Sequence, residues 1–250
     1  MRKLVRNIFR SVSVLKLFLS AKRFGLLVRT NESSKFDAEF NISWSQSGED
    51  LVLQHVLGDI KNGYYIDIGA HDPSRFSVTR KLYQQGWSGI NIDANEDCIP
   101  KFKKERKRDL NLNFAVGQKN QYRFYNYVES ALSTTSEDFV KRYIGNNRRS
   151  RQIQSERLVK GITLNQVFQL VPQEIHIDLI NMDIEGSELD ALKSCNFENF
   201  NKANLPTYFL IETSPPVSNS LSSEVCKFMI GLGYEPWLVL PQNTLFKVVN

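Results

Sequence analysis

The feature that most constrains the fold of this chain is an alternation of short apolar runs with helix-like segments. From residue 64 onward, runs typical of buried strands are followed by segments with helical periodicity. This order is the pattern of β-α-β units, which build a parallel sheet with helices on both faces. We therefore predict one doubly wound α/β domain. Its expected strands are residues 64–68, 89–93, 112–116, 177–182 and 208–212, and its expected helices are 78–85, 100–109, 164–170, 188–194 and 225–232, with a further helix after residue 47.

Two parts of the chain depart from this alternation. The last two apolar runs, 234–240 and 244–249, are separated by Pro-Gln-Asn and predict a terminal β-hairpin. An insertion lies at about residues 120–160, between the third and fourth expected strands. Its aromatic, alternating run 122–128 predicts a strand. The stretch 141–160 has few apolar residues and carries Arg148, Arg149 and Arg151, so it predicts a loop or lid.

Basic residues are concentrated near the start of the chain. Of the 32 Lys and Arg residues, eight lie in residues 1–30, which contain no acid, and the remaining 24 face 27 acidic residues. A slightly acidic body argues against nucleic acid as a partner, because nucleic-acid binding requires a basic surface. The basic run 101–108 is expected to be a solvated helix face, with contact to a phosphate-bearing substrate as the alternative.

Residues 1–30 are the first of three expected regions, followed by a polar linker at 31–44 and the α/β domain at 45–250. The first region has apolar residues at helical spacing and cations on its other faces. This pattern is typical of a helix at an anionic membrane surface. A helix packed on the domain, or a leader segment, is the alternative. The region is too short and too charged to span a bilayer.

The three cysteines, Cys98, Cys195 and Cys226, are far apart and do not form CxxC pairs. This pattern predicts neither a zinc site nor a disulfide framework, and it favours a reducing cytosol. We therefore expect a cytoplasmic protein, located at the inner face of the membrane if its first region binds lipid.

The residues that end the predicted strands are the first candidates for a site, because ligands of doubly wound sheets bind at the carboxyl ends of the strands. Gly69 follows the first strand and allows a tight turn. Asp93 ends the second strand, at the position along the chain where an acid reaches ribose hydroxyls. A dinucleotide needs two further glycines, but this turn carries His71 and Ser74 near those places. The turn therefore fits a smaller adenosyl ligand such as S-adenosylmethionine.

Carboxylates end the later strands. Asp183 and Glu185 share a face at strand spacing, Gly186 opens the turn after them, and Glu212 ends the next strand. Such acids can polarise a substrate hydroxyl, lie near a sulfonium, or bind a divalent cation, for which an all-oxygen site favours magnesium or manganese. In the alternative interpretation, Glu185 caps the next helix and Asp183 holds a loop. His71 is the best-placed imidazole.

Four blocks of the sequence resemble the FkbM family of S-adenosylmethionine-dependent methyltransferases, over roughly residues 45–212. They are Ser45-Gln-Ser-Gly-Glu-Asp, Tyr65-Ile-Asp-Ile-Gly-Ala-His-Asp-Pro-Ser-Arg-Phe-Ser-Val-Thr, Gly86-Trp-Ser-Gly-Ile-Asn-Ile-Asp and Met182-Asp-Ile-Glu-Gly-Ser-Glu-Leu. The resemblance implies a class I methyltransferase fold, which is Rossmann-like and has a seven-stranded sheet whose last strand is antiparallel. It also implies cofactor contacts from Gln46, Glu49, Asp67, Gly69, Ala70, His71, Asp93, Ala94, Ala115, Val116 and Asp183, with Asp50 as a further contributor.

The resemblance further implies methyl transfer to a hydroxyl, most often of a sugar, a polysaccharide or a polyketide-derived compound. We expect Asp183 to be the base, with Glu185, Glu212 and His71 as the next candidates; if a metal is bound, the three carboxylates are its expected ligands. The alternatives are a non-catalytic nucleotide-binding module in a glycan-assembly complex and a methyltransferase for a small secondary metabolite. Acceptor specificity should come from the insertion at 120–160 and from the region after Glu212.

Overall fold

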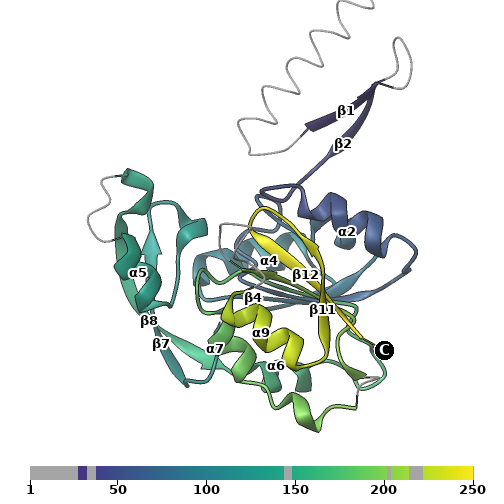
Figure 1. Cartoon of the computed structure of the whole chain (residues 1–250). Coiled ribbons are helices and arrows are strands. Elements are labelled where there is room, and N and C mark those ends of the chain that lie inside the picture. The colour runs from purple at the N-terminus through teal and green to yellow at the C-terminus, as the bar shows by residue number, and fades with distance from the viewer. Residues whose placement is uncertain (1–27, 33–37, 144–147, 202–203, 214–221, 250) are drawn as a thin grey trace, which may run out of the picture.

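A seven-stranded mixed sheet forms the centre of the molecule (Figure 1). The computed structural model describes residues 28–32, 38–143, 148–201, 204–213 and 222–249. The strand order is β11-β12-β10-β9-β3-β4-β5. These strands are β3 (Tyr64–Ile68), β4 (Ser88–Asp93), β5 (Leu110–Asn113), β9 (Leu179–Met182), β10 (Tyr208–Glu212), β11 (Tyr234–Val239) and β12 (Asn243–Val248).

The pairing confirms the predicted parallel sheet with an antiparallel hairpin at its end. β5, β4, β3, β9 and β10 pair in parallel. β12 runs antiparallel to both β10 and β11, so the terminal hairpin completes the sheet. This order with its reversed strand is the class I methyltransferase topology that the resemblance implies. The expected strand 112–116 is divided, because β5 ends at Asn113 and Ala115 and Val116 pair within a different sheet.

Helices cover both faces of the sheet, as the β-α-β pattern predicts. Figure 1 shows α2 and α4 on one side of the sheet and α6, α7 and α9 on the other. The helices that follow the strands are α2 (Glu49–Leu57), α3 (Arg80–Gln84), α4 (Ile99–Glu105), α6 (Leu164–Gln169), α7 (Glu188–Lys193) and α9 (Glu224–Gly231). Two layers of helix around one sheet bury both faces of the strands, which explains their nearly continuous apolar sequences.

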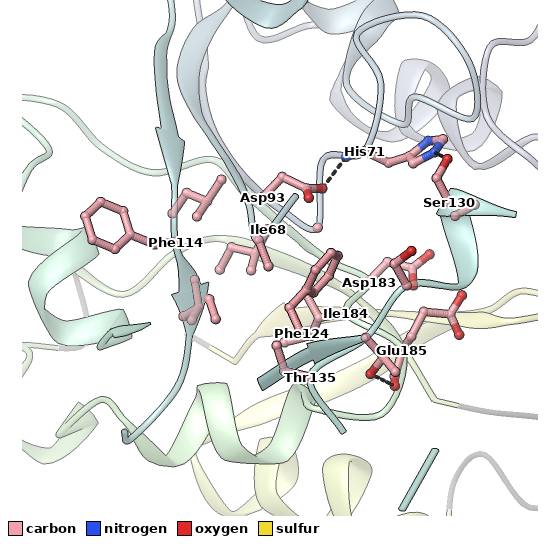
Figure 2. Close-up of a pocket in the computed structure, with 18 residues that line it drawn as sticks. Ile68, His71, Asp93, Phe114, Phe124, Ser130, Thr135, Asp183, Ile184 and Glu185 are labelled. Carbon is pink, nitrogen blue, oxygen red and sulfur yellow. Dashed lines mark hydrogen bonds between the residues drawn. The ribbon is translucent and has the colours of Figure 1, made fainter. Parts of the chain in front are cut away.

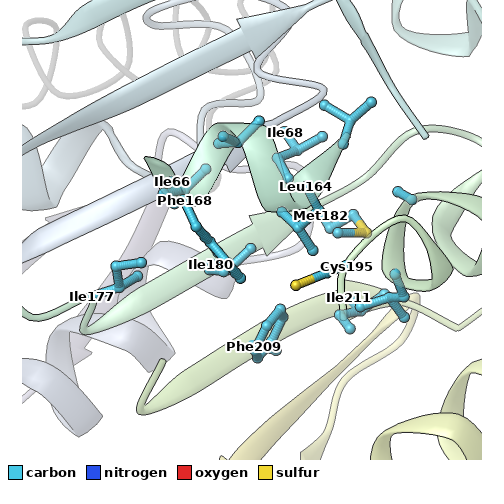
Figure 3. Close-up of a cluster of buried hydrophobic side chains, with 14 of the residues drawn as sticks. Ile66, Ile68, Leu164, Phe168, Ile177, Ile180, Met182, Cys195, Phe209 and Ile211 are labelled. Carbon is cyan, nitrogen blue, oxygen red and sulfur yellow. The ribbon is translucent and has the colours of Figure 1, made fainter. Parts of the chain in front are cut away.

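Alternate residues of each strand enter the two halves of the core. Tyr65 packs with Leu53 and Leu82 on the side of α2 and α3. The next residue, Ile66, joins the larger cluster on the other side, where Phe168 of α6 packs (Figure 3). Burying an apolar side chain of this size stabilises the fold by about 1.5–3 kcal/mol. The core therefore fixes the strand ends that carry the polar residues of the site.

The insertion forms a second, three-stranded sheet beside the main one (Figure 1). Its elements are β6 (Ala115–Val116), β7 (Gln121–Tyr127), α5 (Glu137–Tyr143) and β8 (Ile153–Ile162). The predicted strand at 122–128 is confirmed. The predicted loop at 141–160 is wrong in its second half, where β8 runs antiparallel to β7 over most of its ten residues. Most side chains of β8 are exposed, so the strand is defined by backbone pairing and lacks the apolar alternation that would have revealed it.

Polar contacts join the insertion to the main domain. The Tyr122 hydroxyl of β7 donates to the Asp190 carboxylate of α7 at 2.5 Å. Elsewhere, the Arg157 guanidinium of β8 donates to Glu96 at 2.7 Å and also to Asn95. Both of these residues lie just after the end of β4. The insertion is therefore tied to the main domain at α7 and at the segment that follows β4.

The basic run 101–108 differs in part from its prediction as a solvated helix face. Arg106 directly follows α4 and is fully buried. Its guanidinium donates to the Tyr65 hydroxyl at 3.0 Å and to the Ser77 hydroxyl at 2.9 Å. The Tyr65 hydroxyl in turn donates to Asp109 at 2.6 Å. This buried network holds the β3–α3 loop against the sheet.

Near the start of the described residues, β1 (Val28–Glu32) and β2 (Ala38–Ile42) pair antiparallel, in the segment where the first region meets the expected linker. The rest of the basic region, residues 1–27, lies outside the described residues. Within the described part of the chain, no helix has the length and apolar character needed to cross a membrane.

Candidate active site

The candidate site lies at the carboxyl ends of β3, β4 and β9 (Figure 2). Gly69 begins the β3–α3 loop with a φ of +80°, and its N–H donates to the Ile92 carbonyl at 2.9 Å. A Cβ atom at this position would lie 1.8 Å from the Asp183 carbonyl oxygen. Only glycine fits such a close approach at a positive φ. The tight turn expected at Gly69 is present, and it brings the first loop directly against the loop that carries Asp183.

Asp93 ends β4 and lines the pocket with its carboxylate. One oxygen accepts a hydrogen bond from the His71 N–H at 2.7 Å (Figure 2). The other accepts from the Asn95 N–H at 2.6 Å. These bonds fix the carboxylate, while burial raises its pKa to about 6. A carboxylate oxygen has more than one acceptor site. Asp93 therefore retains acceptor capacity for a pair of hydroxyls, which is the role predicted for it.

Apolar side chains form the wall of the pocket beyond Asp93. They come from strand ends and from the insertion, and they are Ile68, Ile92, Phe114, Ala115, Val116, Phe124 and Ile184. Ala94, Ala115 and Val116, which the resemblance implies as cofactor contacts, all line this pocket. Phe124 of β7 was not assigned to the site from the sequence. Its position in an alternating aromatic run was the only signal. A flat ring such as adenine can lie against a wall of this kind.

His71 lies in the loop after Gly69 with a φ of +54°, which is unusual for a residue with a side chain. Its Nε2 atom lies 2.9 Å from the Ser130 hydroxyl of the insertion. Burial lowers the pKa of the imidazole, so the ring is neutral at pH 7. Its Nδ1 atom is buried and has no hydrogen-bond partner among the described residues. Since buried polar atoms are normally satisfied, this atom is available to a bound molecule.

Four other residues that the resemblance implies as cofactor contacts lie behind or beside the pocket. The Asp67 carboxylate is buried under the loop, where it accepts from the Thr79 hydroxyl at 2.6 Å and the Asn181 amide at 2.8 Å. Ala70 is buried and does not line the pocket. Gln46 and Glu49 line an adjacent pocket together with Gly69, His71 and Asp183. Asp50, the further contributor, is buried and accepts from Ser45 and the Trp44 N–H.

The acids predicted at the later strand ends meet at the edge of this pocket. Carboxylate oxygens of Asp183, Glu188 and Glu212 lie within 4.8 Å of one another. Glu188 was expected only as a helix-starting residue, yet its carboxylate folds back to accept from the Ile184 N–H at 3.0 Å. Glu185 lines the same pocket from a φ of +52° but does not belong to this group of three.

The electrostatics of these acids are unusual. Burial raises the pKa of Asp183, Glu185, Glu188 and Glu212. For Asp183, Glu185 and Glu212, repulsion from neighbouring carboxylates adds to the effect of burial. Raised carboxyl pKa values in a cleft are typical of sites that transfer protons.

A cavity of about 630 Å³ adjoins the pocket and shares Asp183 and Glu185 with it. Besides these acids and Glu212, it is lined by residues of the insertion and by single residues from three loops. The further lining residues are Gln46, Phe76, Glu129, Ala131, Leu132, Phe139, Arg142, Tyr143, Arg148, Ser150, Arg151 and Gln242. The site thus has two compartments that share Asp183 and Glu185.

Comparison with protein families identifies the chain. The model of the "Methyltransferase FkbM domain" matches residues 67–236, more than half of the sequence. The chain belongs to the FkbM methyltransferase family. It is therefore an S-adenosylmethionine-dependent methyltransferase, as the sequence blocks implied. No curated protein matches the chain.

Solved structures of other methyltransferases resemble this FkbM methyltransferase only distantly. A TehB-like SAM-dependent methyltransferase from Corynebacterium glutamicum is 12% identical with a TM-score of 0.38, and the alignment covers 81% of this chain and 88% of that chain. A protein from Pyrococcus horikoshii named as an RNA methyltransferase is also 12% identical with a TM-score of 0.38, and 81% of this chain and 84% of that chain are covered.

The described residues of this FkbM methyltransferase fit S-adenosylmethionine. The Asp93 carboxylate suits the ribose hydroxyls, and the apolar wall with Phe114 and Phe124 suits the adenine. The unpartnered Nδ1 atom of His71 offers one further polar contact. Asp183 lies where the pocket meets the cavity, so the negative charge of its ionised carboxylate is placed to favour a sulfonium there.

Proposed function

We propose that this FkbM methyltransferase methylates a hydroxyl oxygen of a sugar in a polysaccharide or glycoconjugate. The observation that carries the proposal is the pair Asp183 and Glu185, which line both the cofactor pocket and the adjoining cavity of about 630 Å³. A cavity of this size suits one or two sugar rings, since small-molecule sites measure roughly 300–1,000 Å³. The acceptor hydroxyl would then meet the acids at the point where the methyl group is delivered.

The cofactor supplies an electrophilic methyl group, so the S–CH₃ bond breaks as the new O–CH₃ bond forms and S-adenosylhomocysteine leaves. A sugar hydroxyl is a weak nucleophile unless its proton is removed during the attack. Asp183 is our candidate for the base that takes this proton. Burial, followed by repulsion from Glu188 and Glu49, raises the pKa of Asp183 to about 7, close to that expected of a general base working at neutral pH.

The other titratable groups of the site suit supporting roles. The raised pKa values keep Glu185 and Glu212 largely protonated at neutral pH, so their carboxyl groups can donate hydrogen bonds to acceptor oxygens. His71 is fixed by a hydrogen bond between its imidazole and the Ser130 hydroxyl and by one from its backbone N–H to Asp93. These contacts favour a role in positioning the cofactor. Orienting the two reactants in this way accounts for much of the rate gain expected in such reactions, about 7–11 kcal/mol.

A divalent cation is a further part of the proposal. The group Asp183, Glu188 and Glu212 offers three carboxylates at suitable spacing, and oxygen ligands suit magnesium or manganese. In that case these three carboxylates would hold the cation, and its charge would supply a lower pKa for the acceptor hydroxyl. Methyl transfer that is lost after chelation and restored by added magnesium would support this part of the proposal.

The Asp183→Asn variant tests the proposed base. We expect S-adenosylmethionine affinity, measured by calorimetry, to change less than about threefold, while methyl transfer falls by about 10²–10⁴-fold. Transfer is measured with labelled cofactor on glycans extracted from cells that carry the protein. The wild-type rate should rise with pH through about 7, the pKa of Asp183, because the base must lose its proton, whereas the variant should lack this rise. Asp59→Asn, an exposed change outside the site, is the matched control.

Three results would contradict the proposal. Full turnover by Asp183→Asn would remove the base role from this residue. Cofactor binding by the wild type without transfer to any glycan fraction would favour a binding module in a glycan-assembly complex, and transfer only to small extracted metabolites would favour the secondary-metabolite alternative.

A further inference from the structure

The acceptor cavity is lined by positive charge as well as by the acids. Arg142 lies at the end of α5, and Arg151 ends the short 3₁₀ helix η3 (Arg149–Arg151). Both side chains line the cavity, together with Arg148. All three arginines belong to the insertion, whereas Asp183 and Glu212 belong to the strand ends of the main sheet. The cavity therefore has a cationic wall and an acidic floor that come from different parts of the chain.

The two arginines Arg142 and Arg151 have no direct ion-pair partner among the described acids of the floor. Neither Arg142 nor Arg151 forms an ion pair with a carboxylate of the described residues. Without a direct ion pair, the Arg142 charge lowers the carboxyl pKa values of Glu185, Glu188 and Glu212 that burial raises. The Arg151 charge acts in the same way on Glu185. The remaining acid of the cavity, Glu129, is already paired at 2.9 Å with Arg75.

Aromatic rings support the two guanidinium groups. The Arg151 guanidinium lies 4.2 Å from the centroid of the Tyr143 ring, and Arg142 lies 5.7 Å from that of Phe139. An arginine supported on a ring face keeps the N–H groups in its own plane available for a second partner. This geometry suits a planar, bidentate bond to a carboxylate or a phosphate. Holding the side chain in place also reduces the entropy that ligand binding would cost.

From this arrangement we propose that the acceptor is an anionic saccharide, whose carboxylate or phosphate group binds Arg142 and Arg151. The inference rests on the proposed function and narrows its substrate class. The anionic group would lie at the cationic wall, which turns the hydroxyl of the same molecule toward Asp183 and Glu185. A neutral sugar would leave both guanidinium groups without a direct ion-pair partner, whereas an anionic one pairs with them.

The test measures binding to the wild-type protein in the presence of S-adenosylhomocysteine, by calorimetry. The probes are glucuronate, its neutral methyl ester and glucose 6-phosphate, so that the first two differ in charge with the same sugar ring. We expect glucuronate or glucose 6-phosphate to bind about 10–100-fold more tightly than the ester, the effect of charged hydrogen bonds. The comparison of the two anions shows whether a carboxylate or a phosphate is preferred.

The double variant Arg142→Gln, Arg151→Gln should reduce the affinity for the preferred anion to that of the neutral ester, and leave the ester unchanged. Arg123→Gln is the matched control, because Arg123 is exposed in the insertion and pairs with Glu156 outside the cavity. S-adenosylhomocysteine affinity is measured for each variant to show that the fold and the cofactor pocket are intact. Replacing both arginines by lysine should restore part of the anion preference, since charge is retained without the bidentate fork.

Equal binding of glucuronate and its ester, or undiminished anion binding by the double glutamine variant, would overturn the inference. Failure of both anions to bind the wild type would overturn it as well. None of these results depends on turnover. If the proposed function is wrong, the wild-type protein would instead transfer no methyl group to any glycan fraction, whatever the charge of its sugars.

Discussion

Strained residues and buried acids meet in the same few loops of the active site. His71, Phe76 and Glu185 have φ values between +52° and +58°, and all three line the cofactor pocket or the cavity beside it. A residue with a side chain costs roughly 1 kcal/mol or more in this conformation. The surrounding sheet bears that cost, because the core and the Arg106 network hold the loops in place. The same contacts that maintain these strained conformations therefore fix the positions of the polar groups in the site.

The acidic group has a stability cost that pH can reveal. Glu212 has its pKa raised to about 10, first by burial and then by repulsion from Asp183, Glu185 and Glu188. Below its ordinary pKa of 4.5, the side chain is neutral in both the folded and the unfolded chain. Above that pH the unfolded chain loses the proton and the folded chain keeps it. The stabilisation present at low pH is therefore lost progressively as pH rises through neutrality.

Glu212→Gln should remove this pH dependence. We expect the variant and the wild type to be nearly equally stable at pH 5, and the variant to be more stable by about 1–2 kcal/mol at pH 8. Urea unfolding at a series of pH values measures the difference in the free energy of unfolding. Glu198→Gln, an exposed change on the surface, should leave the pH dependence of the wild type unaltered.

Parallel stability curves for wild type and Glu212→Gln would show that the acid is ionised in the folded protein, against the pKa direction given above. The same titration also addresses the cation. If magnesium binds Asp183, Glu188 and Glu212, adding it should flatten the wild-type curve and leave Glu212→Gln much less affected, because a ligand that binds only the folded state stabilises it.

Single residues of the site differ in how far the sequence could predict them. Gly69 and Asp93 were predictable because each sits at a fixed place in a strand–turn–helix unit, where backbone geometry restricts the residue type. Glu188 was not, because its helix-start pattern indicates a cap, whereas its carboxylate folds back toward Asp183. Arg106 shows the same limit. A cation in a basic run is normally solvated, and its burial depends on partners far away in the sequence.

At the scale of elements, the main sheet was predictable, whereas in the insertion the sequence revealed β7 and missed β8. The strands of the sheet are buried on both faces and read as apolar runs bounded by turns. β8 is an exposed strand whose sequence, Ile-Gln-Ser-Glu-Arg-Leu-Val-Lys-Gly-Ile, carries little of that signal. It forms because β7 offers backbone partners to most of its residues. The arginine-bearing elements that follow β7 owe their place in the cavity to this pairing.

Tyr122→Phe tests whether the insertion is held in place from the main domain. The lost hydroxyl bonds Asp190 of α7 at 2.5 Å and accepts the Lys119 N–H at 2.9 Å. We expect the free energy of unfolding to fall by about 1–2 kcal/mol, since the Asp190 carboxylate loses its hydrogen bond from the Tyr122 hydroxyl. Hydrogen exchange should speed up in β7 and β8 and remain unchanged in β3 and β4. Acceptor affinity should fall more than cofactor affinity, because the cavity depends more on the insertion than the cofactor pocket does.

Tyr125→Phe is the control for this prediction, because the Tyr125 side chain belongs to the same strand and has no hydrogen bond to the main domain among the described residues. Uniform acceleration of exchange across both sheets after Tyr122→Phe would show that the two sheets unfold as one unit. In that case the insertion would be an integral part of the domain and not a separately anchored element.

At the scale of the whole molecule, charge is divided between two regions. The described domain carries the acidic floor of the active site, whereas residues 1–30 hold eight cations and no acid. An overall charge of +5 therefore describes neither region. The apolar residues at helical spacing among these cations are typical of a helix that lies in a membrane interface. We propose that this region places the enzyme at an anionic membrane surface, where membrane-attached glycans would be within reach.

Removal of residues 1–27 tests this placement and leaves β1 intact. The full chain should sediment with vesicles of phosphatidylserine and phosphatidylcholine, and the truncated chain should stay in the supernatant. Seven of the eight cations are lost, and each is worth about 1 kcal/mol near such a surface, so binding should fall by several orders of magnitude. Added salt should weaken the binding of the full chain, because screening acts on exposed charges.

Vesicles of phosphatidylcholine alone, together with unchanged cofactor affinity of the truncated chain, are the controls. Equal sedimentation of both chains would show that another part of the protein binds the membrane. A full chain that does not bind anionic vesicles would contradict the membrane role and favour a basic region that packs on the domain.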